Sequence, residues 1–405
     1  MKISNKPVQF YLIGKIYPFL LLIAVFQFLS SCRDGNDPVQ EPDRYLVSAT
    51  AMGELDKQQV VQKVNQIYPS LAAIVQNGVR LYRVVYKTVN VDGAEIEASG
   101  AVAVPIGEKS YPMISVQHGT IMDDASAPSS FTEGNDFMNF GSLVGALGYI
   151  AVFPDYIGYG ASAAFPHPYE HRASLGSASL DMLRAVKEFL KKEQAQVWNK
   201  KLYISGYSEG GYATLSLQKM LEENAKGEFD LKASTCGAGA YNKTMFMKHL
   251  INNESSRKAS NNRSYIWVLL SYNAIYRLDQ PASYFFREPY AGQIEKEKQY
   301  VSIDKSFNEL LRPDFVDRIN NGSEKAFMDA VSDNDLIDWK PLTPTQLYHG
   351  TSDDLVFYFN SETAYQAMKA KGATQVELKT LPGKDHGTAI EQYLIGTLSF
   401  FSTKQ

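Results

Sequence analysis

Cysteine is nearly absent from this chain of 405 residues, which contains only two. An excess of basic residues is also missing: the net charge is −4, which excludes the electrostatic footprint of a nucleic-acid-binding protein. No low-complexity tract or internal repeat interrupts the sequence. Hydrophobic residues are abundant, at 44%, and aromatic residues make up 12%. This composition can build a large core, as one domain with an insertion or as two domains.

The N-terminus is predicted to be a targeting segment. Three lysines lie within the first 15 residues, and an apolar stretch begins at residue 19. This stretch is too short to span a membrane comfortably. It ends in Leu-Ser-Ser-Cys at residues 29–32, which resembles the cleavage and lipidation site of bacterial lipoproteins. We therefore expect residues 1–31 to be a lipoprotein signal peptide; an ordinary signal peptide or a signal anchor remains the alternative.

Lipidation of Cys32 would have two consequences. Cys236 would have no partner, so we expect no structural disulfide and a buried, packed thiol at that position. The protein would be an exported bacterial lipoprotein that a lipid anchor holds on the membrane. Residues 32–53, which include Pro38 and Pro42, are predicted to form a flexible tether.

The part after this tether begins with a helix and a hairpin. Residues 54–75 have apolar positions at near-helical spacing, interrupted near Pro69, and predict a broken amphipathic helix. Residues 80–91 and 94–104 alternate apolar and polar residues on either side of Asp-Gly. This pattern predicts an antiparallel hairpin.

Strands and helices then alternate along the chain. The predicted strands are 113–117, 149–153, 202–205, 232–236, 345–348 and 376–381, and the predicted helices are 137–147, 177–192, 361–371 and 388–401. Such alternation predicts an α/β fold with a mostly parallel sheet that helices cover on both faces. Ligands of these sheets bind at the carboxyl ends of the strands.

Residues 241–342 break this alternation. The segment contains aromatic and helical stretches but no convincing strand, and it lies between two predicted strands. We expect it to form a helical cap. It would divide the core domain into residues 54–240 and 343–405.

The sequence Gly-Tyr-Ser-Glu-Gly at residues 206–210 follows a short apolar run and precedes an Ala- and Leu-rich helical pattern. Strand, sharp turn and helix are what a nucleophile elbow requires, because the residues two before and two after the serine must be small. Ser208 is therefore the candidate nucleophile.

A nucleophilic serine needs a base and an acid that orients it. Both follow Ser208 at predicted strand ends: Asp353 after residues 345–348, and His386 after residues 376–381. Asp354 is the competing acid. The order Ser, acid, His is that of one particular fold.

These motifs resemble the α/β-hydrolase family over about residues 80–405. The likeness rests on the elbow, on His-Gly-Thr at 118–120, on His-Gly-x-x-Asp-x-x-Val at 349–356 and on His-Gly at 386–387. It implies an α/β-hydrolase fold with a mostly parallel eight-stranded sheet and Asp353 as the acid. Within the family, the bacterial secretory lipase and esterase branch is most similar.

The other histidines are assigned other roles. His118 lies in the loop whose backbone the family uses for the oxyanion hole, and His349 is expected to pack or hydrogen-bond locally. His167 and His171 are expected in a structural loop rather than in a metal pair, since no further ligand is evident. His249 is expected to be solvated in the cap.

A tetrahedral intermediate also needs two hydrogen-bond donors. The backbone amide of Glu209 is expected to supply one, and the resemblance implies the amide of Thr120 for the other. The Glu209 side chain is expected to be solvated or to lie at the helix N-terminus. No metal or organic cofactor is required.

Together these features predict an exported serine carboxylic-ester hydrolase that forms an acyl-enzyme. Its substrate would be a small-molecule, lipid or polysaccharide ester. A serine peptidase of the same fold is the first alternative, because the chemistry does not separate esters from amides. A non-catalytic surface-binding lipoprotein is the second.

Overall fold

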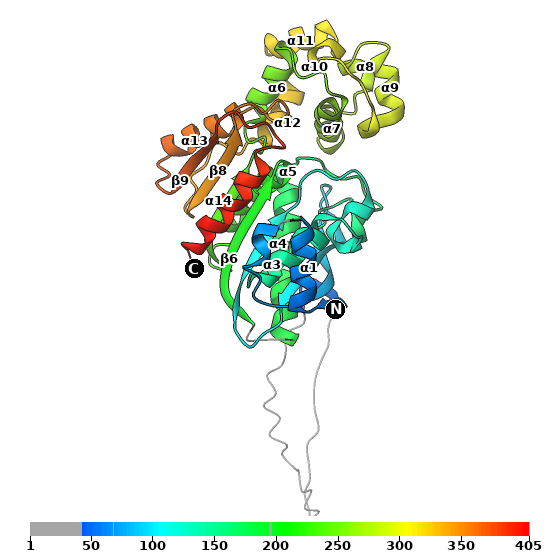
Figure 1. The fold of residues 1–405 in the computed structure, drawn as a ribbon. Coiled ribbons are helices and arrows are strands. Elements are labelled where there is room, and N and C mark those ends of the chain that lie inside the picture. Colours follow the sequence, from blue (N-terminus) through cyan, green and yellow to red (C-terminus); the bar gives the residue numbers. More distant parts are fainter. Residues whose placement is uncertain (1–42, 68, 194–196, 405) are drawn as a thin grey trace, which may run out of the picture. The chain divides into compact units, whose positions relative to one another are not determined.

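A nine-stranded sheet forms the centre of the part of the chain that the computed structural model describes, residues 43–404 without residue 68 and residues 194–196 (Figure 1). The strands are β1 (Leu46–Leu55), β2 (Val79–Val89), β3 (Glu95–Pro105), β4 (Tyr111–Gln117), β5 (Ile150–Pro154), β6 (Trp198–Tyr207), β7 (Asp230–Gly237), β8 (Thr345–Gly350) and β9 (Val376–Leu381).

The sheet changes from antiparallel to parallel along its width. Its order is β1-β2-β3-β5-β4-β6-β7-β8-β9. The pairs β1–β2, β2–β3 and β3–β5 are antiparallel, and every pair from β5 to β9 is parallel. The predicted hairpin is confirmed as β2 and β3. The prediction of a mostly parallel sheet is also confirmed, but eight was the wrong number of strands.

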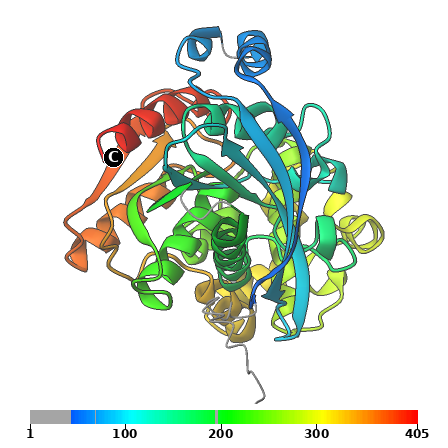
Figure 2. The same cartoon turned by 90° about the horizontal axis from the view of Figure 1, so that it is seen from below.

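The additional strand is β1, and it corrects the predicted tether. Residues 46–53, assigned to the flexible segment, lie in β1 and pair with β2 (Figure 2). The Glu188 carboxylate accepts the amides of Tyr45 and Leu46 and so holds the start of this strand. Every β1 residue is exposed or half-buried. The strand is held by its backbone, so no apolar alternation marked it in the sequence.

Helices cover both faces of the sheet. On one face lie α4 (Arg172–Glu193), α5 (Glu209–Glu223) and α13 (Phe359–Ala370), whose apolar residues pack against the strands. On the other face lie α1 (Lys57–Ile67), α3 (Ser142–Ala146) and α14 (Ile390–Ser402), which contribute to a separate core cluster. The short helix α2 (Pro69–Ala72) follows α1, as the break near Pro69 predicted.

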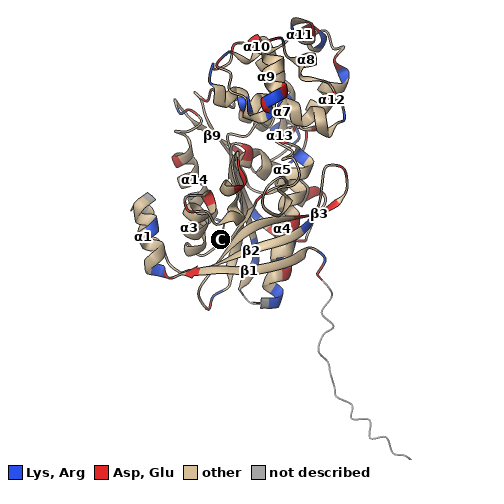
Figure 3. Cartoon of the chain, turned by 90° about the vertical axis from the view of Figure 1, so that its right-hand side faces the viewer, with Lys and Arg blue, Asp and Glu red and all other residues tan. Residues whose placement is uncertain are grey.

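The segment between β7 and β8 is helical. Its helices are α6 (Lys243–Asn252), α7 (Ala259–Ile275), α8 (Ala282–Phe285), α9 (Tyr290–Glu297), α10 (Phe307–Leu310), α11 (Pro313–Asn320) and α12 (Lys325–Asp333). They gather at one end of the sheet around their own aromatic-rich core (Figure 3). This agrees with the helical character predicted for residues 241–342. Among the described residues, no helix is long and apolar enough to cross a membrane.

The structure describes one of the two cysteines. The predicted signal peptide and Cys32 lie outside the described residues. Cys236 lies on β7 as a buried, free thiol, as predicted. Burial raises the pKa of this thiol to about 12, so it is protonated and unreactive at neutral pH.

Candidate active site

Ser208 lies on a strained turn between β6 and α5. Its backbone has φ 60° and ψ −126°, a conformation that is costly for a residue with a side chain. The turn is possible because its flanks are glycines. A Cβ on Gly206 would lie 2.3 Å from the Gly210 carbonyl oxygen, and one on Gly210 would lie 2.1 Å from that of Gln117. The elbow geometry predicted from the sequence is therefore present.

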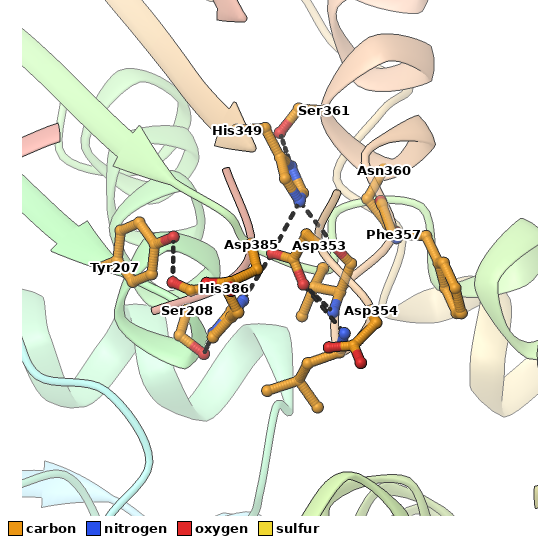
Figure 4. Close-up of polar contacts among 12 residues, drawn as sticks. Tyr207, Ser208, His349, Asp353, Asp354, Phe357, Asn360, Ser361, Asp385 and His386 are labelled. Atoms are coloured by element: carbon orange, nitrogen blue, oxygen red, sulfur yellow. Dashed lines mark hydrogen bonds and ion pairs between the residues drawn. The ribbon is translucent and has the colours of Figure 1, made fainter. Parts of the chain in front are cut away.

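Ser208, His386 and Asp353 form one chain of hydrogen bonds (Figure 4). His386 Nε2 lies 2.9 Å from Ser208 Oγ, and Nδ1 lies 2.6 Å from Asp353 Oδ2. The carboxylate accepts a hydrogen bond from the Nδ1–H group, so the neutral imidazole has a free lone pair at Nε2. That lone pair accepts the serine hydroxyl, which is the arrangement of a base beside its nucleophile.

The Asp353 carboxylate is held from several sides. Its side chain is fully buried, and Oδ1 accepts the amides of Leu355 and Val356 at 3.0 and 2.9 Å. Burial alone would raise the pKa of Asp353, but hydrogen bonds from His349 and His386 outweigh it and hold this pKa well below its usual value. The carboxylate therefore stays ionised at pH values low enough to protonate a free aspartate.

His349 contributes more than local packing. Its Nε2 lies 2.6 Å from the Val356 carbonyl oxygen and 3.3 Å from Asp353 Oδ2, and Nδ1 lies 2.7 Å from Ser361 Oγ. The predicted local hydrogen bonds are present, and the ring also contacts Oδ2 of Asp353, the oxygen that His386 contacts (Figure 4). Its position four residues before Asp353 was the available sequence signal.

The two neighbouring carboxylates, those of Asp354 and Asp385, have other partners than His386. Asp354 is partly exposed and forms an ion pair with Lys258 at 2.6 Å. Asp385 accepts the amides of Gly387 and Thr388 and so caps the turn before α14. Asp353 is thus the acid that the fold brings to His386.

The loop after β4 is braced from the loop after β5. Thr120 lines the same cavity as Ser208 and His386. Thr120 Oγ1 lies 2.9 Å from the Tyr169 hydroxyl, and the Tyr169 ring stacks on Trp267 of α7 at 4.3 Å between centroids. Tyr169 was not identified from the sequence, because nothing along the chain links residue 169 to residue 120.

Glu209 is the first residue of α5 and follows Ser208 directly. Its side chain lies at the helix N-terminus, as one alternative predicted, but it is buried rather than solvated. Its Oε1 lies 2.7 Å from His167 Nε2, and His167 Nδ1 lies 2.7 Å from the Ile157 carbonyl oxygen. The loop histidine is therefore structural, as predicted, and it anchors the elbow through a partner that the sequence did not reveal.

Two further histidines have structural partners. His118 is buried and stacks on Tyr156 at 4.2 Å between centroids. His249 was predicted to be solvated, and this is wrong: it is half-buried against Phe357, at 4.5 Å between centroids. Aromatic residues of two distant segments meet there, which sequence spacing does not show. The described residues contain no cluster of three or more metal-ligating side chains.

The burial of His171 is expected to make the free energy of unfolding depend on pH. Burial lowers its pKa from 6.5 to about 4, although Asp333 opposes this shift. Between these values the unfolded chain binds a proton that the folded protein excludes, so stability falls as the pH falls. We expect the free energy of unfolding to decrease by about 2 kcal/mol from this residue between pH 7.5 and pH 5. Urea unfolding at both pH values measures the decrease, and His171→Gln should show a smaller one; an equal decrease in that variant would contradict the assignment.

A cavity of about 620 Å³ opens over Ser208. Cap residues of α6 and α7 form an apolar part of its wall, which includes Phe246, Met247, Leu250 and Val268. Two buried charged residues also line it: Lys243 and Glu170, which form an ion pair with each other. The cavity can thus accept a largely apolar group next to the reacting serine.

Comparison with known proteins gives a partial match in sequence. Residues 300–400 match the prolyl oligopeptidase family. This stretch includes Asp353 and His386 but not Ser208. No curated protein sequence matches the chain.

Solved structures match most of the chain. A Legionella pneumophila protein assigned to the hydrolases is 26% identical, with a TM-score of 0.78, over 89% of this chain and 98% of the other. The rice cell wall degrading esterase LipA from Xanthomonas oryzae is 21% identical, with a TM-score of 0.73, over 89% and 99%. Candida antarctica lipase A in its closed state is 18% identical, with a TM-score of 0.64, over 90% and 82%. With these matches and the hydrogen-bonded serine, histidine and aspartate, the protein is a serine hydrolase of the α/β-hydrolase fold.

Proposed function

We propose that this protein is an exported hydrolase of carboxylic esters that works through an acyl-enzyme. The observation that supports this most is the hydrogen-bond chain from Ser208 through His386 to Asp353, at the floor of a largely apolar cavity. These hydrogen bonds connect a nucleophile to a base and the base to an acid that orients it, so the proton of the serine hydroxyl can move to the histidine.

In the first step, Ser208 Oγ attacks the ester carbonyl carbon while His386 Nε2 takes its proton. Asp353 stabilises the imidazolium that forms. The tetrahedral intermediate collapses, and His386 gives the proton to the departing alcohol. Water then attacks the acyl-enzyme by the same route, with His386 first as base and then as acid, and releases the carboxylic acid.

The negative charge of the intermediate requires donors fixed in advance. In this proposal the amide of Glu209 is one, because it is the first amide of α5 and follows the nucleophile. The amide of Thr120 is the other, and the bond between Thr120 and Tyr169 supports the loop that presents it. Each such donor typically contributes about 3–4 kcal/mol to stabilising the transition state.

The substrate class is proposed from the cavity and from the similar structures. The apolar wall formed by the cap suits an acyl chain or another apolar group of a small-molecule, lipid or polysaccharide ester. The similar structures include an esterase and a lipase. The match to the prolyl oligopeptidase family favours a second candidate, a serine peptidase.

One comparison separates the two candidates. Purified protein is assayed with p-nitrophenyl esters from acetate to palmitate and with peptide p-nitroanilides, including proline at the cleaved bond. We expect hydrolysis of esters at rates far above those of the anilides. Faster cleavage of a peptide anilide than of every ester would make the peptidase the better assignment.

The export and the lipid anchor are proposed from the sequence. We expect Cys32→Ala to remove metabolic labelling with palmitate, because the acyl chains that provide the membrane affinity would be attached through this residue. Cys236→Ala is the matched control and should keep the label. Palmitate labelling of Cys32→Ala equal to that of the unaltered protein would contradict a lipid anchor at this residue.

A further inference from the structure

Arg263 is a cation in the wall of the cavity without a counter-ion. It lies in the second turn of α7 and lines the cavity that contains Ser208 and His386. Its Nε is buried and has no hydrogen-bond partner. Within the described part of the chain, its guanidinium forms no ion pair. An arginine in this state lacks an acceptor that a ligand can supply.

The other charged groups of the wall do not neutralise Arg263. Glu170 is already paired with Lys243, and that pair is buried. Asp136 also lines the cavity, but it is exposed to solvent and is not within ion-pair distance of Arg263. A ligand near Arg263 therefore meets an uncompensated positive charge.

Two hydroxyl groups lie on the same side of α7. Ser260 and Ser264 line the cavity together with Arg263, and spacings of three and four residues place side chains on one helix face. All three residues lie in the first two turns of this helix of 17 residues, where the helix dipole favours an anion. A guanidinium is a suitable donor for a carboxylate, and the exposed Ser260 hydroxyl, which donates to Asn261 Oδ1 at 3.2 Å, can rotate to add a second donor.

This set lies close to the reacting centre. The Tyr169 hydroxyl is hydrogen-bonded to Thr120 and lies near the Ser264 hydroxyl. Ser264 is therefore separated from the predicted oxyanion loop by a single side chain. Arg263 and Ser208 line the same cavity, so one substrate can contact both residues.

We propose that Arg263, with Ser260 and Ser264, binds a carboxylate group carried by the ester substrate. The inference rests on the proposed ester hydrolysis and names its substrate class: esters that bear a second, ionised acid. The carboxylate belongs either to the acyl group or to the alcohol, and both sources present the same chemistry to the guanidinium.

Two matched pairs of substrates test the inference and separate the sources. Monoethyl succinate and ethyl butyrate have acyl chains of equal length, and only the first carries an acyl carboxylate. The esters 4-acetoxybenzoate and 4-acetoxybenzamide carry the charged or neutral group on the alcohol side. Proton release gives kcat and KM for each ester with the unaltered protein, Arg263→Gln and Arg263→Lys.

We expect the unaltered protein to prefer the charged member of at least one pair. Arg263→Gln should lower kcat/KM for that member by about 10- to 100-fold, mainly through KM, since a hydrogen bond to a charged group has this effect. It should change kcat/KM for the neutral member less than about twofold, and Arg263→Lys should keep part of the preference.

Three outcomes decide against the inference. They are a preference for the neutral member of both pairs, an equal loss on charged and neutral esters in Arg263→Gln, or an unchanged ratio in that variant. The preference of the unaltered protein decides the matter if neither variant folds. Failure of the proposed function looks different: the unaltered protein would hydrolyse no ester in either pair.

Discussion

Ser208→Ala is expected to lower kcat for ester hydrolysis by about 10⁴- to 10⁶-fold, as loss of the nucleophile does in serine hydrolases. The reason is geometric. His386 Nε2 lies 2.9 Å from Ser208 Oγ, and alanine leaves this base without a hydroxyl to activate. The residual rate would come from water and from the oxyanion donors alone. The measurement is steady-state hydrolysis of p-nitrophenyl butyrate, together with covalent labelling by a fluorophosphonate.

The control is a serine outside the cavity. Ser332 is exposed on α12, and Ser332→Ala should keep both the labelling and the activity. Labelling of Ser208→Ala at the level of the unaltered protein would mean that another residue is the nucleophile. An unaltered protein that neither reacts with the fluorophosphonate nor hydrolyses any ester would instead favour a non-catalytic binding protein.

Asp353→Asn is expected to lower kcat by about 10⁴-fold, the effect seen when the acid of such a triad becomes an amide. Oδ1 of this residue accepts two backbone amides, from Leu355 and Val356, so the asparagine oxygen must take that place. Its NH₂ group then faces His386 Nδ1 and donates to it. The proton of the imidazole moves to Nε2, which can no longer accept the proton of Ser208.

The matched control is one residue away. Asp354 pairs with Lys258 at the surface, where an ion pair contributes little. Asp354→Asn should change kcat less than about twofold and leave the free energy of unfolding nearly unchanged. Thermal unfolding of both variants separates loss of activity from loss of structure. A large loss in Asp354→Asn with normal activity in Asp353→Asn would exchange the roles of the two residues.

The central strands and the order of the site could be predicted because their signals are local. Short apolar stretches that predict strands precede Ser208, Asp353 and His386. Each of these residues follows the end of its predicted strand. Parallel strands bring their carboxyl ends to one edge of a sheet. The three residues were therefore expected to meet, although Ser208 and His386 are 178 positions apart in the chain.

The contacts that support the site could not be predicted, because their partners are distant in the sequence. The partner of Glu209 is His167, the partner of Thr120 is Tyr169, and the guanidinium of Arg263 enters the cavity from α7. Each of these relations joins segments that only the folded backbone brings together. The edge strand β1 escaped prediction for a related reason, because backbone pairing rather than an apolar pattern holds it.

By itself, the amino-acid sequence determined the class of fold, the helical insertion, the serine and histidine of the hydrogen-bond chain, and two adjacent candidates for its acid. These features depend on glycines at a tight turn, on the periodicity of apolar residues and on the order of the motifs along the chain, all of which can be read directly from the sequence. Only the tertiary structure decided between Asp353 and Asp354, added β1 to the sheet and placed Arg263, whose Nε has no partner, in the wall of the cavity that contains the nucleophile. Those outcomes depend on burial and on distances between segments that are remote in the sequence. Both are fixed only when the core excludes water, because each buried polar group then needs a hydrogen-bond partner within the protein.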